Sequence, residues 1–356
     1  EKRAFLYRHH RPLSQSGELP KWDGTTPLRF KSDPKEYTWH DEIMGDMHTG
    51  PEVIDDFILI KSDGFPTYNF AHIVDDAEMK ITHIVRGQEF ISSQPNYMNL
   101  YEALGLNHPI FASVPPILGE SGMKKLGKRD GAKDVLEYFK EGYLQEALVN
   151  FIASMGWNDG TEQEIFTIDE LTNKFSLDRV QRSGARFDEK RLLWMNSQWT
   201  RKLSLDDLYE RCFDFWPEAA KNTDENFKKQ ILALVQDRLK TLTDLSVLTP
   251  YFFEEPIPDW KMIENNKQLN SLPRQEIKGL LIAAQKALRE SEFDTESIQN
   301  TLNKLLIKTD QKPAVLFSLI RLAVSWAPFS PSLNDTLSAI GKEKVDSRLQ
   351  TAIETV

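Results

Sequence analysis

A short basic stretch is the part of the sequence whose residue types most clearly suggest chemistry. Residues 122–131, GMKKLGKRDG, place Lys124, Lys125, Lys128 and Arg129 between glycines in a chain whose formal net charge is −10. Four cations this close repel one another and cannot be buried without partners. Water solvates them on an idle surface loop, the commoner case, or a polyanion completes the site. Ammonium groups here could stabilise charge on a leaving pyrophosphate.

Arg86 is the second candidate, because it directly follows the β-branched run ITHIV. A guanidinium at the end of a strand can bind a carboxylate through two parallel hydrogen bonds. A salt bridge to Asp75, Asp76 or Glu89 is an equally good interpretation on spacing alone. The sequence leaves both alternatives open.

Other polar side chains in the same region have weaker claims. Tyr68 could hydrogen-bond a ligand through its phenol, although a half-buried core tyrosine is commoner. His72 and His83 have no partners at metal-ligand spacing, which favours packing roles for both. Asp75 and Asp76 could bind Mg²⁺, but such a pair more often caps a helix. We therefore expect no metal site made by the protein alone.

The elements that would position these residues follow from the hydrophobic pattern. Short apolar runs predict strands at 55–60, 81–85 and 108–118, and helical spacing predicts a helix at 93–106. Residues 66–79 fit either a helix or an irregular segment. Strand, helix and strand in succession indicate a parallel βαβ unit, in which ligands lie beyond the carboxyl ends of the strands.

The rest of the chain divides into an irregular start and a helical remainder. Residues 1–50 contain four prolines and mixed charge, with little periodicity. Residues after the basic stretch show helical periodicity, and we expect the Trp and Phe residues beyond 200 to be core. A proline-bearing break is expected at 252–260. The expected helices span 133–142, 144–157, 205–217, 225–249, 272–291, 294–308, 312–327 and 331–354.

Composition limits the classes of protein that fit. A chain of 356 residues is too long for one ordinary core, so two or three domains are expected. No run of about 18 apolar residues occurs, so we expect no membrane span. The single cysteine, Cys212, rules out a disulfide framework and favours a cytoplasmic location. The net negative charge argues only weakly against a polyanionic partner, because electrostatic binding depends on local patches of charge.

Three ordered blocks make the sequence resemble a glutamyl-tRNA synthetase of the bacterial or organellar type, a class I aminoacyl-tRNA synthetase. They are SDGFPTYNFAHIVDDAEMKITHIVRGQEF (62–90), GMKKLGKRDGAKDVLEYFKEGYLQEALVNFIASMGW (122–157) and ARFDEKRLLWMN (185–196). The segment 312–345 is also similar. The resemblance runs from about residue 25 to the end of the chain.

The resemblance implies a reaction and a set of site residues. ATP, with Mg²⁺, would activate L-glutamate to glutamyl-adenylate, and the glutamyl group would pass to the 3′ end of glutamate tRNA. KLGKR (125–129) matches the KMSKS-type loop, which implies catalytic roles for Lys125 and Lys128. Arg86 and Tyr68 take the positions that bind the amino acid. The residues implied to bind ATP are Lys125, Lys128, Arg129, Leu118, Glu89 and Phe90.

Two departures from the family pattern stand out. Gly127 replaces the usual serine of the loop, which we expect to weaken its function without abolishing it. The N-terminal His-x-Gly-His signature does not occur, and the chain begins mid-element without Met. We therefore expect that roughly the first hundred residues are missing, a typical half-fold length. Such a chain could be inactive alone.

The expected fold is α/β plus all-α. Residues 1–50 would be the remnant of an acceptor-end insertion module, and 51–120 the second half of a Rossmann-like catalytic domain. Residues 121–200 would hold the KMSKS-type loop and a helical stem-contact region, before an all-helical anticodon-binding domain at 201–356. We expect a monomer. The candidates for tRNA binding, which could equally be solvated helix faces, are Lys174, Arg179, Arg182, Arg186, Lys190 and Arg191.

Two alternatives to the ligase are weighed. A glutaminyl-tRNA synthetase shares the catalytic ancestry, but that family ends in β-barrels, whereas residues 200–356 are helical by pattern. A tRNA-binding module without catalysis is the other, because the signature is missing. Steep loss of tRNA affinity with salt is expected for either tRNA-binding protein.

Overall fold

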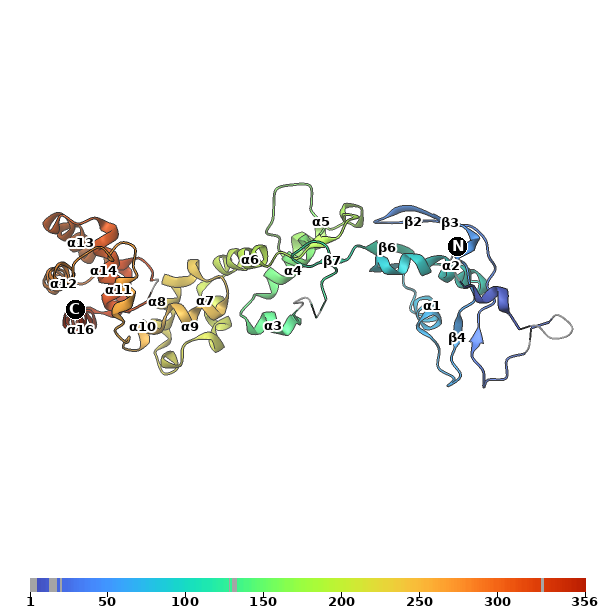
Figure 1. The fold of residues 1–356 in the computed structure, drawn as a ribbon, viewed down its shortest axis with the longest axis horizontal. Helices are drawn as coiled ribbons and strands as arrows, with labels where there is room; N and C mark the ends of the chain where they lie inside the picture. The colour runs from blue at the N-terminus through green and yellow to red at the C-terminus, as the bar shows by residue number, and fades with distance from the viewer. Residues whose placement is uncertain (1–4, 13–17, 20, 128, 130–132, 328–329) are drawn as a thin grey trace. The chain divides into compact units, whose positions relative to one another are not determined.

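The computed structural model describes residues 5–12, 18–19, 21–127, 129, 133–327 and 330–356. The chain divides into two compact units (Figure 1). Unit 1 comprises Glu1–Ala132 and Asn150–Asp188, and unit 2 comprises Lys133–Val149 and Glu189–Val356.

Unit 1 is built on a four-stranded sheet with the strand order β3-β2-β6-β5. β5 and β6 are parallel and in register from His83 opposite Ile110 to Gly87 opposite Val114. The crossover between them carries the 3-10 helix η3 (Gln88–Ser93) and α2 (Gln94–Ala103). The parallel βαβ unit predicted from the sequence is confirmed here. The strands span Gly45–Thr49, Tyr37–Asp41, Ile110–Val114 and His83–Gly87.

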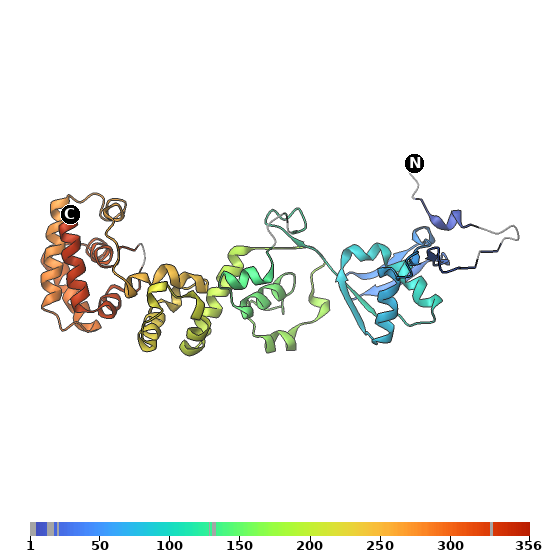
Figure 2. The ribbon, with the colours of Figure 1, turned by 90° about the horizontal axis from the view of Figure 1, so that it is seen from below.

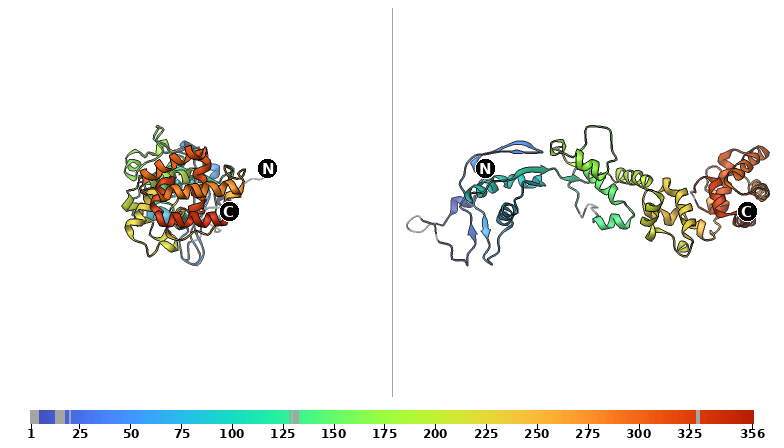
Figure 3. Two further views of the ribbon diagram at one scale, coloured as in Figure 1. Left: turned by 90° about the vertical axis from the view of Figure 1, so that its left-hand side faces the viewer. Right: turned by 180° about the vertical axis from the view of Figure 1, so that it is seen from behind.

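The first 50 residues contain more order than expected, because β2 and β3 form an antiparallel hairpin, the blue two-stranded ribbon in the right-hand view of Figure 3. Along β2, Tyr37, Trp39 and Asp41 are buried while the residues between them are exposed. Tyr37 and Trp39 pack against Ile54, Met98 and Phe111. The expectation of an irregular segment was therefore wrong at 37–49, where a two-residue period is present in the sequence.

Asp41 connects this hairpin to the parallel strands. Its side chain is 1% exposed, and Oδ1 accepts hydrogen bonds from the backbone N–H groups of Ile43 (3.0 Å), Met44 (2.9 Å) and Ser113 (3.0 Å). One carboxylate oxygen thus satisfies donors from the hairpin turn and from β6, which a buried backbone requires.

The strand predicted at 55–60 forms, but outside the parallel sheet. β4 (Ile58–Ile60) pairs antiparallel with β1 (Leu28–Arg29). The chain then turns at Gly64 (φ +82°) and returns to begin α1 (Tyr68–Glu78). The ambiguous segment 66–79 is thus mostly helical. Ile73 of α1 packs in a second apolar cluster with Tyr97, Leu100 and Tyr101 of α2.

The predicted strand 108–118 is two strands, because Pro115 and Pro116 interrupt it. β6 ends at Val114, and β7 (Ile117–Leu118) pairs in parallel with β8 (Ala185–Arg186). Proline has no N–H to donate to a ladder, so the break follows from the sequence. Unit 1 also contains α5 (Ile168–Lys174), whose N-terminus is closed by a capping box between Thr167 and Glu170.

Among its described residues, unit 2 contains helices and no named strand, which agrees with the predicted helical tail. Helix α4 begins in the unit 2 segment 133–149 and continues into the sequence of unit 1. In the C-terminal part of the chain, drawn in orange and red in Figure 2, α12 packs along α16. The helix expected at 331–354 is two helices, separated at Gly341 with φ +90°. The helices are α3 (Val135–Lys140), α4 (Gln145–Ser154), α6 (Glu189–Lys202), α7 (Leu205–Arg211), α8 (Glu225–Val235), α9 (Leu245–Leu248), α10 (Pro250–Phe253), α11 (Trp260–Glu264), α12 (Arg274–Arg289), α13 (Thr295–Thr309), α14 (Pro313–Ser325), α15 (Leu333–Ile340) and α16 (Lys342–Thr355).

The other 3-10 helices are single turns. They are η1 (Tyr7–His10), η2 (Pro51–Val53), η5 (Leu177–Arg179), η6 (Phe213–Phe215), η7 (Glu218–Ala220), η8 (Gln236–Arg238) and η9 (Leu242–Asp244). Phe213 is 82% exposed, so the expectation that the aromatic residues beyond 200 are core was wrong at this position. Among the described residues, no helix is both long and apolar enough to cross a membrane.

Candidate active site

Five side chains of unit 1 form a closed ring of contacts, called the aromatic ring below. Tyr68 stacks on His72, with ring centroids 4.8 Å apart, and His72 meets Tyr97 edge-on at 4.7 Å. The Arg86 guanidinium carbon lies 5.0 Å from the ring centroids of both Tyr97 and Phe90. Phe90 completes the circuit at 5.9 Å from Tyr68. A cation held over two aromatic faces is favourable in itself.

The aromatic ring is assembled from four elements by simple spacing rules. Tyr68 and His72 are four residues apart on α1, so they share one face of that helix. Arg86 is the fourth residue of β5, opposite Ser113 of β6. Phe90 and Tyr97 come from η3 and α2, the crossover that returns the chain from β5 to β6. The ring therefore lies where a parallel strand meets its crossover.

Arg86 is not paired with an acid in the part of the chain that the structure describes. Its Nη2 donates to Oε1 of Gln94, while Nη1 is buried without a hydrogen-bond partner among the described residues. Gln94 Nε2 is also buried without a hydrogen-bond partner among the described residues. The alternative of a salt bridge to Asp75, Asp76 or Glu89 is therefore not realised. A buried cationic donor left unsatisfied is costly unless a ligand supplies an acceptor.

Burial determines the charge of the neighbouring groups. It lowers the pKa of His72, and the positive charge of Arg86 acts in the same direction. Burial is also the main reason that the pKa of Tyr101 is raised to about 12, with the charge of Asp76 adding to it. The imidazole and the phenol are thus held neutral around a permanently charged guanidinium.

The basic stretch begins on a small hairpin that fixes Lys125. Leu126 N donates to Ile117 O (2.8 Å) and Gly119 N to Lys124 O (2.9 Å). Lys125 Nζ donates to Glu89 Oε1 at 2.9 Å, with both side chains more than half exposed. The backbone N–H of Glu89 and then Lys125 lower the pKa of the Glu89 carboxyl. This ion pair connects the loop to η3, which also carries Phe90.

The remaining residues expected to bind ATP differ in how exposed they are. Leu118 is half-buried in β7, and its carbonyl accepts from Phe187 N at 2.9 Å. It lies opposite Lys125 in the hairpin. Arg129 is exposed, and Lys128 lies outside the described residues. Four of the residues singled out from the sequence, Tyr68, Arg86, Phe90 and Glu89, thus occur in or next to the aromatic ring.

Sequence reasoning missed three residues that complete this site. His72 was assigned to packing, and Gln94 and Tyr97 were seen only as part of a helix. A signal for His72 existed, since it follows Tyr68 by four residues on a helix. Gln94 and Tyr97 are three apart at the start of α2, but only the register of the crossover brings them to Arg86.

The candidate tRNA-binding residues are divided between the units. Arg182 lies against the tip of the β2–β3 hairpin, where a Cβ on Gly45 would be 3.1 Å from its Nη2. Arg186 is exposed in β8. Lys190 is exposed and Arg191 half-buried at the start of α6, in unit 2. Lys174 is paired with Asp159 at 2.7 Å. The role of this set stays a prediction.

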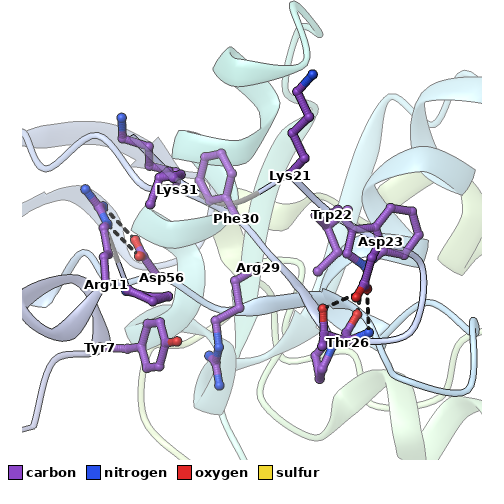
Figure 4. Close-up of a pocket in the computed structure, with 14 residues that line it drawn as sticks. Tyr7, Arg11, Lys21, Trp22, Asp23, Thr26, Arg29, Phe30, Lys31 and Asp56 are labelled. Atoms are coloured by element: carbon purple, nitrogen blue, oxygen red, sulfur yellow. Dashed lines mark hydrogen bonds and ion pairs between the residues drawn. The ribbon is translucent and has the colours of Figure 1, made fainter. Parts of the chain in front are cut away.

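A cavity of about 580 Å³ lies in the first part of unit 1 (Figure 4), and its lining residues, between Tyr7 and Asp56 in the sequence, do not include those expected to bind ATP or glutamate. In its lining, the guanidinium carbon of Arg29 lies 3.9 Å from the centroid of the Tyr7 ring. Trp22 Nε1 donates to Thr26 O at 2.7 Å. Arg11 is neutralised by a two-point contact with Asp56, at 2.7 Å for each hydrogen bond. Among the other lining residues are Leu19, Lys21, Asp23, Phe30 and Lys31.

Comparison with known proteins shows which family the chain belongs to. Residues 9–194 match the family "tRNA synthetases class I (E and Q), catalytic domain", and residues 207–353 match "Anticodon binding domain". A glutamate–tRNA ligase of Caldanaerobacter subterraneus is 35% identical over 340 residues, which are 94% of this chain and 70% of that protein. The chain belongs to the glutamate–tRNA ligase family.

Two further members of the family are similar to most of this chain. The glutamate–tRNA ligase of Clostridium botulinum is 36% identical over 99% of this chain and 73% of its own length. A solved glutamate–tRNA ligase from Elizabethkingia meningosepticum, in complex with its amino acid, has a TM-score of 0.81 at 30% identity, covering 92% of this chain and 68% of that one.

A relative from Caldicellulosiruptor saccharolyticus is 35% identical and is covered over 65% of its length. These curated relatives are thus covered over 65% to 73% of their length. The expected fold class, α/β followed by all-α within the class I synthetases, is confirmed. The β-barrel ending expected for a glutaminyl-tRNA synthetase is not found among the described residues beyond 200, which form helices and no named strand.

Proposed function

We propose that this chain binds L-glutamate and ATP, forms glutamyl-adenylate, and transfers the glutamyl group to the 3′ end of glutamate tRNA. The observation that carries the proposal is Arg86, a guanidinium held between two aromatic rings with one buried nitrogen that no described residue satisfies. The family to which the chain belongs indicates which carboxylate would satisfy it.

On the glutamate side, Arg86 would bind a carboxylate through two parallel hydrogen bonds. Tyr68, which belongs to the same set of contacting side chains, is 58% exposed, so its phenol is available to hydrogen-bond the same amino acid. The buried surroundings of Arg86 strengthen this pairing relative to water. Tyr97 donates to Asn69 Oδ1 at 2.8 Å. Its ring would pack against the guanidinium without contacting the ligand.

On the nucleotide side, Lys125 and Lys128 would stabilise charge on the phosphates as the adenylate forms. Arg129 would add a third cation, and Glu89, Phe90 and Leu118 would surround the nucleotide. Mg²⁺ would enter bound to ATP, because it is usually held by substrate phosphates together with few protein groups. The pairing of Lys125 with Glu89 supports this assignment, since it brings the loop to the aromatic ring.

On the tRNA side, the cations Arg182, Arg186, Lys190 and Arg191 would contact phosphates. We also propose the division made from the sequence, with the acceptor end meeting residues 1–50, the stem meeting 121–200 and the anticodon meeting 201–356. Lys21, Arg29 and Lys31 line the cavity of Figure 4 without an acidic partner among the described residues, and together with the aromatic rings there they support an RNA contact by the first segment. The protein would act in the cytoplasm as a monomer.

The test is glutamate-dependent exchange of pyrophosphate into ATP by this chain, measured with glutamate tRNA added. Exchange with glutamate and not with glutamine is expected. No exchange, together with salt-sensitive tRNA binding, would overturn the enzyme and favour a tRNA-binding module. Charging of glutamine in place of glutamate would favour the glutaminyl-tRNA synthetase.

A variant of the loop sharpens this test. Lys128→Ala is expected to lower kcat of exchange about 10²- to 10³-fold, because it removes a group that stabilises developing phosphate charge. Affinity for tRNA should be unchanged. A fall in tRNA affinity at an unchanged exchange rate would show that the loop contacts RNA.

A further inference from the structure

His72 is the member of the aromatic ring that has no role in the proposed chemistry. It comes from α1, one turn after Tyr68, and joins that exposed phenol to the buried Tyr97. The two ring planes of Tyr68 and His72 are 17° apart, so the contact is a true stack. The stack covers one face of a phenol that is otherwise 58% exposed.

The hydrogen bond of His72 defines its tautomer. Nδ1 lies 2.7 Å from the backbone carbonyl oxygen of Tyr68. A carbonyl only accepts, so Nδ1 must carry the hydrogen. His72 therefore contacts Tyr68 at two points, through the ring stack and through the hydrogen bond to the Tyr68 carbonyl. Nε2 has no protein hydrogen-bond partner in the described part of the chain, so the neutral form leaves no donor unsatisfied.

Burial, more than the surrounding charges, favours the neutral form of His72. Arg86 opposes a second positive charge, whereas Asp75 and Asp76 on the same helix favour one. Burial is the largest influence and acts with Arg86. Stacking of a neutral imidazole on a phenol next to a guanidinium avoids the repulsion that an imidazolium would introduce.

We propose that His72 is a positioning residue of the amino-acid pocket: the Nδ1–H hydrogen bond to the Tyr68 carbonyl fixes the imidazole, and the ring stack holds the Tyr68 phenol against it. The proposal rests on the proposed function, since it assigns Tyr68 and Arg86 to the same ligand. His72 touches no substrate in this account. By restricting the Tyr68 side chain to the conformation that binds the amino acid, His72 lowers the entropic cost of ordering that side chain when the ligand binds.

The kinetic test compares two variants of the full chain. His72→Leu removes the aromatic face and the donor, and the KM for glutamate should rise about 3- to 10-fold at unchanged kcat, as expected for loss of one aromatic pair. His72→Phe keeps the face and should recover most of that loss. Glu78→Gln, at an exposed position of the same helix, is the control. A wild-type KM in His72→Leu would overturn the proposal.

A second measurement reads the positioning without activity. The ¹⁵N shifts of the His72 ring at pH 7.5 should show a protonated Nδ1 and an unprotonated Nε2. The ring protons of Tyr68 should lose their stacking shift in His72→Leu and keep it in His72→Phe. A protonated Nε2, or Tyr68 shifts unaffected by either change, would overturn the proposal. Absence of exchange in the wild type with these shifts present would overturn the proposed function alone.

Discussion

Lys125 Nζ lies 2.9 Å from Glu89 Oε1. The two residues are 36 positions apart, and the resemblance to the synthetase family implies that both bind ATP. Their contact shows that the start of the basic loop and η3 meet in the folded chain. Because both side chains are mostly exposed, the pair is weak and screened by water. Phosphate oxygens can therefore replace Glu89 as the partner of Lys125 at little cost.

The first prediction concerns this lysine. Lys125→Ala is expected to lower kcat of pyrophosphate exchange about 10²- to 10³-fold, since a donor aimed at developing charge is lost. Lys124→Ala removes the same charge from the adjacent, exposed position and is expected to retain wild-type exchange. Equal losses in the two variants would mean that the stretch acts only through its overall charge.

Arg86 gives a sharper prediction about the amino acid. Arg86→Lys keeps the charge but not the planar fork, so the KM for glutamate should rise about tenfold or more. Arg86→Ala should be worse still. Lys80→Ala, which removes an exposed cation between α1 and β5, serves as the control. If Arg86→Lys has the glutamate KM of the wild type, the guanidinium only packs between Phe90 and Tyr97.

Asp41 predicts a loss of stability without a direct effect on chemistry. Asp41→Ala leaves three backbone N–H groups without their acceptor, which should lower the free energy of unfolding by about 3 kcal/mol at roughly 1 kcal/mol or more per group. Asp41→Asn keeps Oδ1, the oxygen that accepts all three bonds, and should lose much less. Urea unfolding of the three proteins measures this. Equal stability of the Ala and Asn variants would refute the account.

The lowered pKa of His72 predicts a pH dependence with a definite sign. A base whose folded pKa lies below its ordinary value, about 6.5, binds fewer protons when folded than when unfolded. Its contribution is therefore unfavourable at low pH and disappears as pH rises above 6.5. Unfolding of the wild type at pH 5 and pH 7.5 should show this difference, and His72→Phe should reduce it. Asp75 and Asp76 are unchanged in that variant, so they cannot account for the reduction.

Much of the fold could be predicted from local patterns. The crossover from β5 to β6 and the helical tail follow from runs of apolar residues with one clear period. The β2–β3 hairpin was missed because flanking prolines and charges obscured the alternation of Tyr37, Trp39 and Asp41. The pairing of β4 with β1 could not be predicted, since its apolar run fits a parallel strand equally well.

The candidate site was predictable where the chemistry of one residue is distinctive. Arg86 lies near the end of β5 and Lys125 in the hairpin that follows β7, and their residue types suggested anionic ligands. His72 and Gln94 are not distinctive singly. Their importance comes from contacts across α1, β5 and α2, which depend on tertiary packing and not on spacing in any one segment.

The chain passes between its two compact units three times, after Ala132, Val149 and Asp188. Residues 133–149 therefore belong structurally with the tail, although they lie far ahead of it in the sequence. Leu144 of that segment donates its backbone N–H to Asn196 Oδ1 at 2.8 Å, and Leu242 N donates to Gly142 O at 3.0 Å. Swapping anticodon domains among relatives should succeed only when this early segment travels with its own tail, because a graft that starts at Glu189 would inherit foreign contacts at both places.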